Sequence, residues 1–185
     1  MRPKTPKPKL ATNGSFDLWS SIMGIGALSS TSRLRSCSLW TGGISHELVR
    51  HRLASYTQSS TRFINYVKKM PPMFVKPAEI TIALDGIWEN AVKASEAAYK
   101  SLIEAGVAPQ IARSVFPNAL ATKVVMTCNL RNWRHFLLMR TTKETHPQMR
   151  QVTIPLLAQF KKAVPLLFDD IEPGQRQADN LKKAR

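Results

Sequence analysis

The chain has 185 residues, enough for one domain, or one domain with a tail, around a core of ordinary size. Its 27 Lys and Arg residues against 12 Asp and Glu give a formal charge of +15, which attracts nucleotides, phosphates, polyanions or acidic membrane surfaces without choosing among them. The two cysteines lack the spacing of a zinc site or a redox pair, and no apolar run is long enough to span a membrane. We therefore expect a reduced, cytoplasmic protein without a bound metal.

The two ends of the chain differ in composition from its middle. Residues 1–41 are rich in Pro and Lys and then in Ser, Gly and Leu, with neither a helical nor a strand period. We expect this segment to be atypical and poorly ordered. Residues 173–185 are basic and polar and predict a tail. The domain itself is expected to span residues 42–172.

Helical spacing begins at Ile44 and predicts a short helix that is capped by Ser45 and ends near Ser55. The polar residues 56–61 are typical of a loop, and residues 62–67 alternate as in a short strand.

The longest helix is predicted over residues 79–105, where Trp88, Val92 and Tyr99 belong to one apolar stripe and Gly106 follows. A helical turn is expected over residues 109–115.

The second half of the chain is mainly helical in pattern. Residues 121–128 are apolar and β-branched and predict a buried strand, and residues 129–139 switch to helical spacing. A long helix is expected to start near His146 and to kink at Pro155 and Pro165.

The tripeptide Arg50-His51-Arg52 is the most specific local feature of the sequence. At the end of a helix, the side chains of two arginines at i and i+2 lie on different sides, so they can bind two groups of an anionic ligand. His51 between them can hydrogen-bond or stack on a ring. The alternative is that the tripeptide is only a basic, solvated helix end.

The loop that follows carries short hydrogen-bond donors and a guanidinium, in Gln58, Ser59, Ser60 and Arg62. Such a set suits a phosphate monoester, so the sequence predicts a nucleotide site.

A second polar set lies in the helix predicted over residues 129–139. Arg131 and His135 are four residues apart and therefore share a face, near Asn129 at the helix start, while Trp133 and Leu137 pack elsewhere. A polar face on a short apolar helix fits the wall of a cofactor site. A plain amphipathic surface helix is the alternative.

Three stretches of the sequence match one known pattern in the same order. Arg50-His51-Arg52, then seven residues and Ser60, resembles the signature of the flavin-dependent thymidylate synthases, and the string SHELVRHRLASYTQSSTRF is similar to that family throughout. The strings GVAPQIARSVFP and TCNLRNWRHFLLMR resemble two further segments of the family. The resemblance covers about residues 44–155.

The resemblance implies methylation of dUMP to dTMP, with the carbon taken from methylenetetrahydrofolate and the hydride from FAD that NADPH has reduced. In this family the flavin replaces a cysteine nucleophile, and neither Cys37 nor Cys128 lies in the Pro-Cys-His setting of such a nucleophile. The family implies a homotetramer with sites shared between subunits. Because the positive charge then faces anionic ligands, we expect neither nucleic acid nor a membrane as partner.

The resemblance also implies roles for individual residues. FAD would be contacted by Arg50, His51, Arg52, Gln58, Asn129, Arg131 and His135. The substrate dUMP would be contacted by Glu47, Arg50, Gln58, Ser59, Ser60, Thr61, Arg62, Arg113 and Arg140. Arg140 is the expected catalytic residue, as a fixed cation beside the uracil that stabilises charge when the ring loses its imide proton.

The sequence departs from the family pattern in three places. Gln58 and Ser59 stand where the family often has Glu and Gln in varied order, which leaves open which of the two orients the flavin. Residues 1–41 contain none of the histidines that the family carries there, which predicts an atypical or truncated N-terminus. Residues 145–150 replace a family segment and leave open whether His146 is a ligand or a helix-start residue. The alternatives to an active synthase are a noncatalytic flavin- or nucleotide-binding relative and a basic, nucleic-acid-associated protein.

The predicted elements include both helices and strands, and the resemblance implies the same mixture. Together they predict an α+β fold in which helices flank a small, mainly antiparallel sheet.

Overall fold

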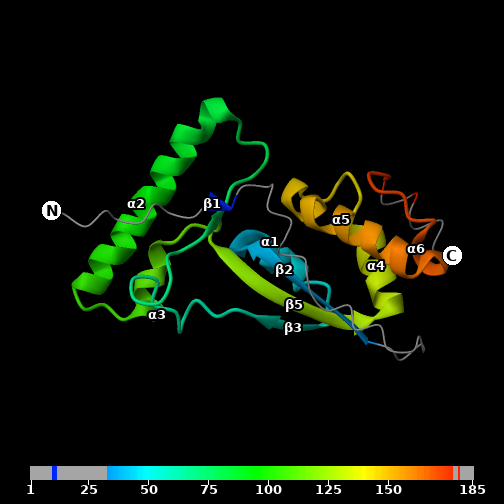
Figure 1. Ribbon diagram of the computed structural model, residues 1–185, viewed down its shortest axis with the longest axis horizontal. Helices are drawn as coiled ribbons and strands as arrows, with labels where there is room; N and C mark the ends of the chain where they lie inside the picture. The colour runs from blue at the N-terminus through cyan, green and yellow to red at the C-terminus, as the bar shows by residue number, and fades with distance from the viewer. Residues whose placement is uncertain (1–9, 12–32, 177–178, 180–185) are drawn as a thin grey trace. The chain divides into compact units, whose positions relative to one another are not determined.

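The computed structural model describes residues 10–11, 33–176 and 179. These residues form an α+β fold, as predicted (Figure 1). The strands are β1 Leu10–Ala11, β2 Arg33–Thr41, β3 Ser55–Gln58, β4 Phe74–Val75 and β5 Ala121–Asn129. The α-helices are α1 Gly42–Leu48, α2 Asp85–Glu104, α3 Pro109–Ala112, α4 Leu130–Arg140, α5 Pro147–Ala163 and α6 Pro165–Phe168, and two 3₁₀ turns are η2 Ile82–Leu84 and η3 Arg113–Val115.

The strands belong to two small sheets. One is antiparallel, with three strands in the order β2-β5-β3 (Figure 1). The other pairs β1 with β4 in parallel, with Leu10 opposite Phe74. The nine-residue β5 is the middle strand of the larger sheet, and its burial alternates along the chain as expected for a strand with two different faces.

The chain divides into two compact units. Unit 1 includes Leu39–His46 and Gln58–Val124, and unit 2 includes Glu47–Thr57 and residues 125–176. The boundaries predicted at residues 41 and 173 stay predictions.

The core of unit 1 lies between α2 and the segments on either side of it. Its buried residues are Tyr66, Phe74, Val92, Tyr99, Ala112 and Leu120. The ring of Tyr99 stacks on Phe116 with centroids 4.6 Å apart. The predicted stripe of the long helix is confirmed, because Val92 and Tyr99 are its buried residues.

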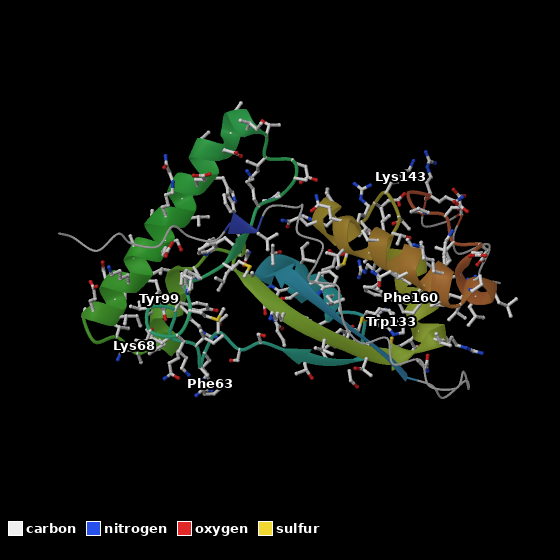
Figure 2. All side chains as sticks on the ribbon, in the orientation of Figure 1. Phe63, Lys68, Tyr99, Trp133, Lys143 and Phe160 are labelled. Carbon is white, nitrogen blue, oxygen red and sulfur yellow. The ribbon has the colours of Figure 1, made fainter. Side chains whose placement is uncertain are left out.

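The core of unit 2 is an aromatic cluster between α4, α5 and α6. The centroids of Trp133 and Phe160 are 5.1 Å apart, and those of Phe160 and Phe168 are 4.9 Å apart (Figure 2). The prediction that Trp133 and Leu137 pack inward is confirmed, because their side chains are 1% and 0% exposed.

The predicted elements from residue 79 onward are confirmed with small shifts of their ends. The long helix starts at Asp85 after a 3₁₀ turn, and the helical turn and the strand lie where they were expected. Pro155 lies inside α5, where the kink stays a prediction, and Pro165 begins the separate helix α6 instead of kinking one long helix.

Five predictions for the N-terminal half are wrong. Residues 33–41 form a strand although no regular structure was expected there; residues 1–9 and 12–32 lie outside the described residues. Helix α1 ends at Leu48 rather than near Ser55, because its last turn closes with three-residue bonds, from the nitrogen of Arg50 to Glu47 (3.2 Å) and from His51 to Leu48 (3.1 Å). Its N-terminal cap is Thr41, whose hydroxyl accepts from the nitrogen of Ile44 at 3.2 Å, and not Ser45.

The other two errors concern the segment after α1. Part of the expected loop, up to Gln58, is strand β3. The expected strand over residues 62–67 is a turn, because the side chain of Asn65 accepts from the nitrogens of Val67 (2.9 Å) and Lys68 (3.0 Å). An Asn side chain that bonds to the backbone two residues on competes with strand pairing.

Gly106 ends α2 in the left-handed region, with φ of 85°. A Cβ there would meet no atom within 4 Å, so Gly106→Ala should cost only the conformational penalty. We expect the free energy of unfolding to fall by about 1 kcal/mol. Chemical denaturation measures this change.

Gly86→Ala is the matched control, since Gly86 lies in α2 without a positive φ and a Cβ there also meets nothing within 4 Å. Alanine is favoured inside a helix, so this variant should gain roughly 0.5–1 kcal/mol. Equal shifts of the two variants in one direction would contradict the assignment of Gly106 as the helix stop.

Candidate functional site

Unit 1 contains a pocket of about 800 Å³. Its wall combines the start of α1, the loop after β3, and α3 with the residues that follow it. The lining residues are Gly42, Ser45, His46, Gln58, Ser59, Ser60, Thr61, Gln110, Arg113, Ser114, Phe116, Pro117, Asn118, Leu120, Ala121 and Thr122. Five of the predicted substrate residues are among them, and the wall is mostly polar.

Two bonds hold the loop after β3 against the α3 region. The guanidinium of Arg113 donates to the hydroxyl of Thr61 at 2.7 Å, and Nε of Arg62 donates to the side-chain oxygen of Gln110 at 3.1 Å. Gln110 and Arg113 are three residues apart and therefore lie on one side of the helical turn. Both predicted arginines are exposed, so their remaining N–H groups are accessible to a ligand.

Gln58 is fixed by hydroxyl groups on two other elements. Its amide nitrogen donates to Ser45 and to Thr122, each at 3.2 Å. The next residue is held through its backbone, where the nitrogen of Ser59 donates to the carbonyl of Lys123 at 2.8 Å. Sequence reasoning missed Ser45, Gln110 and Thr122 as site residues, because each touches the loop only through tertiary contacts.

The RHR tripeptide lies in a loop of unit 2. Because α1 ends at Leu48, Arg50 is in a turn, and His51 and Arg52 follow it outside any helix or strand. The prediction that they sit on a helix end is therefore wrong. Both arginines are exposed and His51 is half-buried. Among the described residues, neither arginine forms an ion pair, which leaves two cations accessible.

The polar face of α4 also belongs to unit 2. Asn129 caps the helix, since its side chain accepts from the nitrogen of Asn132 at 2.9 Å. Arg131 and His135 are exposed, whereas Trp133 is buried, so the predicted division of the helix into two faces is confirmed. The rings of His51 and His135 lie 5.5 Å apart, which places the tripeptide beside this face.

The surroundings of His51 lower its pKa. Burial lowers its pKa most, the charges of His135 and Arg140 lower it further, and a hydrogen bond with the backbone of Asn132 acts in the opposite direction. Its Nε2 atom is buried and has no partner among the described residues. Buried polar atoms normally have a partner, so this atom, with the cations around it, fits the presence of a polar, anionic cofactor.

Arg140, the predicted catalytic residue, is the last residue of α4. Its guanidinium forms an ion pair with Glu47 in the last turn of α1, and the two side chains are 26% and 27% exposed. Thr153 donates its hydroxyl to the carbonyl of Arg140 at 2.7 Å. Both ends of this residue are therefore held. Glu47 and Arg140 lie in unit 2, whereas Arg113 and the predicted phosphate residues lie in unit 1.

His146 lies at the start of α5. This exposed residue is the N-cap of α5, and its Nδ1 accepts from the nitrogen of Gln148 at 3.2 Å. It therefore acts as a helix-start residue, and the alternative that it is also a ligand stays open. Elsewhere among the described residues, no helix is long and apolar enough to cross a membrane, and no three His, Cys, Asp or Glu residues form a group that suits a metal ion.

The fold and these two polar sites define an α+β protein with cationic sites of the kind that bind phosphate-bearing ligands. Residues 34–166 match the family described as thymidylate synthase complementing protein. Curated proteins named flavin-dependent thymidylate synthase are similar over most of the chain, and the chain belongs to this family of enzymes. One from Mycobacterium sp. (strain KMS) is 35% identical over 193 residues, which cover 90% of this chain and 73% of the relative.

Two further relatives of the same name have nearly the same sequence identity to this chain. The protein from Geobacter sulfurreducens is 36% identical over 132 residues, which cover 70% of this chain and 56% of the relative. The protein from Mycobacterium tuberculosis (strain ATCC 25177 / H37Ra) is 35% identical over 187 residues, which cover 90% of this chain and 73% of the relative.

Proposed function

We propose that this protein is a flavin-dependent thymidylate synthase that methylates dUMP to dTMP. The carbon donor is methylenetetrahydrofolate, the cofactor is FAD, and NADPH supplies the reducing equivalents. The active form is a homotetramer in the cytoplasm. The observation that carries the proposal is that six of the seven predicted flavin residues lie in one unit, on the loop after α1 and on α4 with its cap residue.

The proposed flavin-binding role rests on the exposed arginines of unit 2 and on the Nε2 atom of His51. Arg50, Arg52 and Arg131 are exposed cations that suit the pyrophosphate of FAD. The Nε2 atom of His51, which has no partner among the described residues, would form a hydrogen bond with the cofactor. When bound, the flavin supplies the hydride for the reaction. The residues themselves bind and orient it.

The nucleotide role rests on the pocket of unit 1. Ser59, Ser60 and Thr61 bring short donors to its wall, and Arg113 adds a guanidinium. Such a set binds a phosphate monoester and the adjoining sugar. Gln58 is the one predicted flavin residue that lies in this unit. In the proposed tetramer, the loop of one subunit completes the site of another.

Arg140 is the proposed catalytic residue. A fixed guanidinium beside the uracil stabilises negative charge when the imide proton leaves, which makes carbon 5 more nucleophilic. Its pair with Glu47 keeps the guanidinium in place before the substrate binds.

A dTMP-formation assay tests the proposal directly. The purified protein is mixed with FAD, NADPH, dUMP and methylenetetrahydrofolate after its visible spectrum has been recorded. We expect a flavin spectrum and turnover that depends on all four components. Omission of each component in turn is the control.

Two results would contradict the proposal. Bound flavin without turnover would identify a noncatalytic flavin-binding member of the family. Neither flavin nor turnover, together with salt-sensitive binding of nucleic acid, would favour the basic nucleic-acid-associated protein.

Gln110→Ala tests how the pocket holds its loop. The change removes the acceptor for Nε of Arg62, so the loop loses order and the phosphate site loosens. A hydrogen bond to a charged group contributes about 1.5–3 kcal/mol, and exposure reduces this value, so we expect the KM for dUMP to rise by about 3- to 10-fold. Steady-state kinetics measure this change, with kcat altered less than about twofold.

Ile111→Ala is the matched control for this helix. Ile111 neighbours Gln110 and its side chain is 59% exposed, so its loss should leave the KM for dUMP unchanged. An equal KM in the Gln110→Ala and wild-type proteins would show that the bond to Arg62 does not support the site.

A further inference from the structure

The loop between α1 and β3, residues 49–54, carries three of the proposed flavin residues and is here called the cationic loop. Its side chains Arg50, His51 and Arg52 would repel one another if they were all charged, and the two arginines are exposed. Ordering the backbone of such a segment costs about 1–2 kcal/mol per residue. A loop of this kind binds an anion well only if other groups hold its conformation beforehand.

Tyr56 holds the first half of the cationic loop. Its hydroxyl lies 2.7 Å from the carbonyl oxygen of His51 and 3.0 Å from that of Leu48, which is the last residue of α1. One O–H group between two carbonyls ties the loop to the end of the helix. Burial, with a contribution from Cys128, raises the pKa of Tyr56 to about 12, so the hydroxyl keeps its proton at neutral pH.

Asn132 holds the second half of the loop. Its side-chain nitrogen donates to the carbonyl oxygen of Leu53 at 2.8 Å. The backbone nitrogen of Asn132 is itself fixed by the cap residue Asn129. Because Arg131 and His135 lie on the same helix, this bond connects the loop with the polar face of α4.

The hydrogen bonds of Tyr56 and Asn132 to the cationic loop together fix the position of His51. Its ring contacts the rings of His135 and Phe136, with centroids 5.5 Å and 5.4 Å away. This position requires the backbone on both sides of His51 to stay where Tyr56 and Asn132 hold it. Neither holding residue was among the predicted site residues.

We propose that Tyr56 and Asn132 are positioning residues that hold the cationic loop in its flavin-binding conformation through the carbonyls of His51 and Leu53. The inference rests on the proposed function, since it assigns the occupant of the loop as FAD. The two side chains act through Arg50, His51 and Arg52 and take no part in the reaction itself.

Tyr56→Phe and Asn132→Ala test the proposal, each by removing one donor. We expect the Kd for FAD, measured by quenching of flavin fluorescence, to rise about 3- to 10-fold in each variant, as befits the loss of one hydrogen bond. At saturating FAD, kcat and the KM for dUMP should return to within about twofold of the wild-type values. The double variant should lose less binding than the sum of the single losses, because both changes loosen the same loop.

Tyr66→Phe is the matched control, because it removes a phenol hydroxyl from unit 1. It should leave the Kd for FAD unchanged. An unchanged Kd in both test variants would overturn the proposal, as would a kcat that stays low at saturating FAD.

Hydrogen exchange of the flavin-free protein separates this inference from the proposed function. Amide exchange in residues 49–54 should accelerate in both variants and stay unchanged in Tyr66→Phe. If the wild-type protein binds no FAD, the proposed function fails and FAD is the wrong occupant. If exchange in the loop is the same in wild type and variants, Tyr56 and Asn132 do not hold the loop, whatever the affinity for FAD.

Discussion

Arg140→Ala should abolish dTMP formation while FAD stays bound. Removal of one preorganised group that stabilises developing charge lowers kcat by about 100- to 1,000-fold. Arg140 suits this role because its guanidinium is paired with Glu47 and its carbonyl is held by Thr153 at 2.7 Å. Such a cation does not have to reorganise during the reaction. The rate of dTMP formation per bound flavin measures the effect.

The flavin spectrum of the same variant separates catalysis from cofactor binding. The loop and the face proposed for FAD keep their own cations in Arg140→Ala, so the visible absorbance should match that of the wild type. Loss of flavin would make Arg140 a binding residue, and activity within about threefold of the wild type would show that it is not catalytic.

Lys143→Ala is the matched control for the lost charge. Lys143 lies three residues after Arg140 in the same unit, and it is exposed (Figure 2). The variant has the same net charge as Arg140→Ala. It should keep wild-type activity, because a general change of charge affects long-range attraction of substrate far less than the loss of a contact.

Trp133→Ala should have the largest effect on stability. The side chain is 1% exposed and its ring lies 5.1 Å from that of Phe160 and 5.8 Å from that of Phe136. Loss of a buried Trp leaves a cavity and lowers the free energy of unfolding by about 3–5 kcal/mol. That is a large part of the roughly 5–15 kcal/mol that keeps a domain folded. The midpoint of chemical denaturation measures the change.

Leu166→Ala is the control for this measurement. Leu166 belongs to the same unit, but its side chain is 94% exposed. Its removal should change the free energy of unfolding by less than about 0.5 kcal/mol. If Trp133→Ala cost no more than this control, the aromatic cluster between α4, α5 and α6 would not be what stabilises the unit.

The second half of the chain was predictable because its signals are local. β5 is rich in β-branched and apolar residues, and α4 begins at Asn129, a residue type that favours helix caps, whose side chain accepts from the nitrogen of Asn132. The division of α4 into a buried face and a polar face follows from the period of 3.6 residues alone. Gly106 ended the long helix for a similar local reason, since its φ of 85° suits glycine.

The first half was less predictable because tertiary contacts override its local pattern. Helical spacing continues past Leu48, yet the helix ends there and Tyr56 binds the carbonyls at its end. The alternating residues 62–67 would suit a strand, but Asn65 forms a turn instead. Strand β2 carries no clear strand period and forms as part of the sheet that β5 centres.

The sequence by itself determined the family, the α+β class and the residue types of the candidate sites, because these depend on motifs and on periods that are short in sequence. Only the tertiary structure decided that Arg50, His51 and Arg52 lie on a loop rather than at a helix end, that Glu47 pairs with Arg140, and that Gln110 and Ser45 join the pocket. These contacts join residues between 13 and 93 positions apart in the chain. The packing of the whole core decides which residues meet at such separations. A local sequence pattern therefore does not predict these contacts.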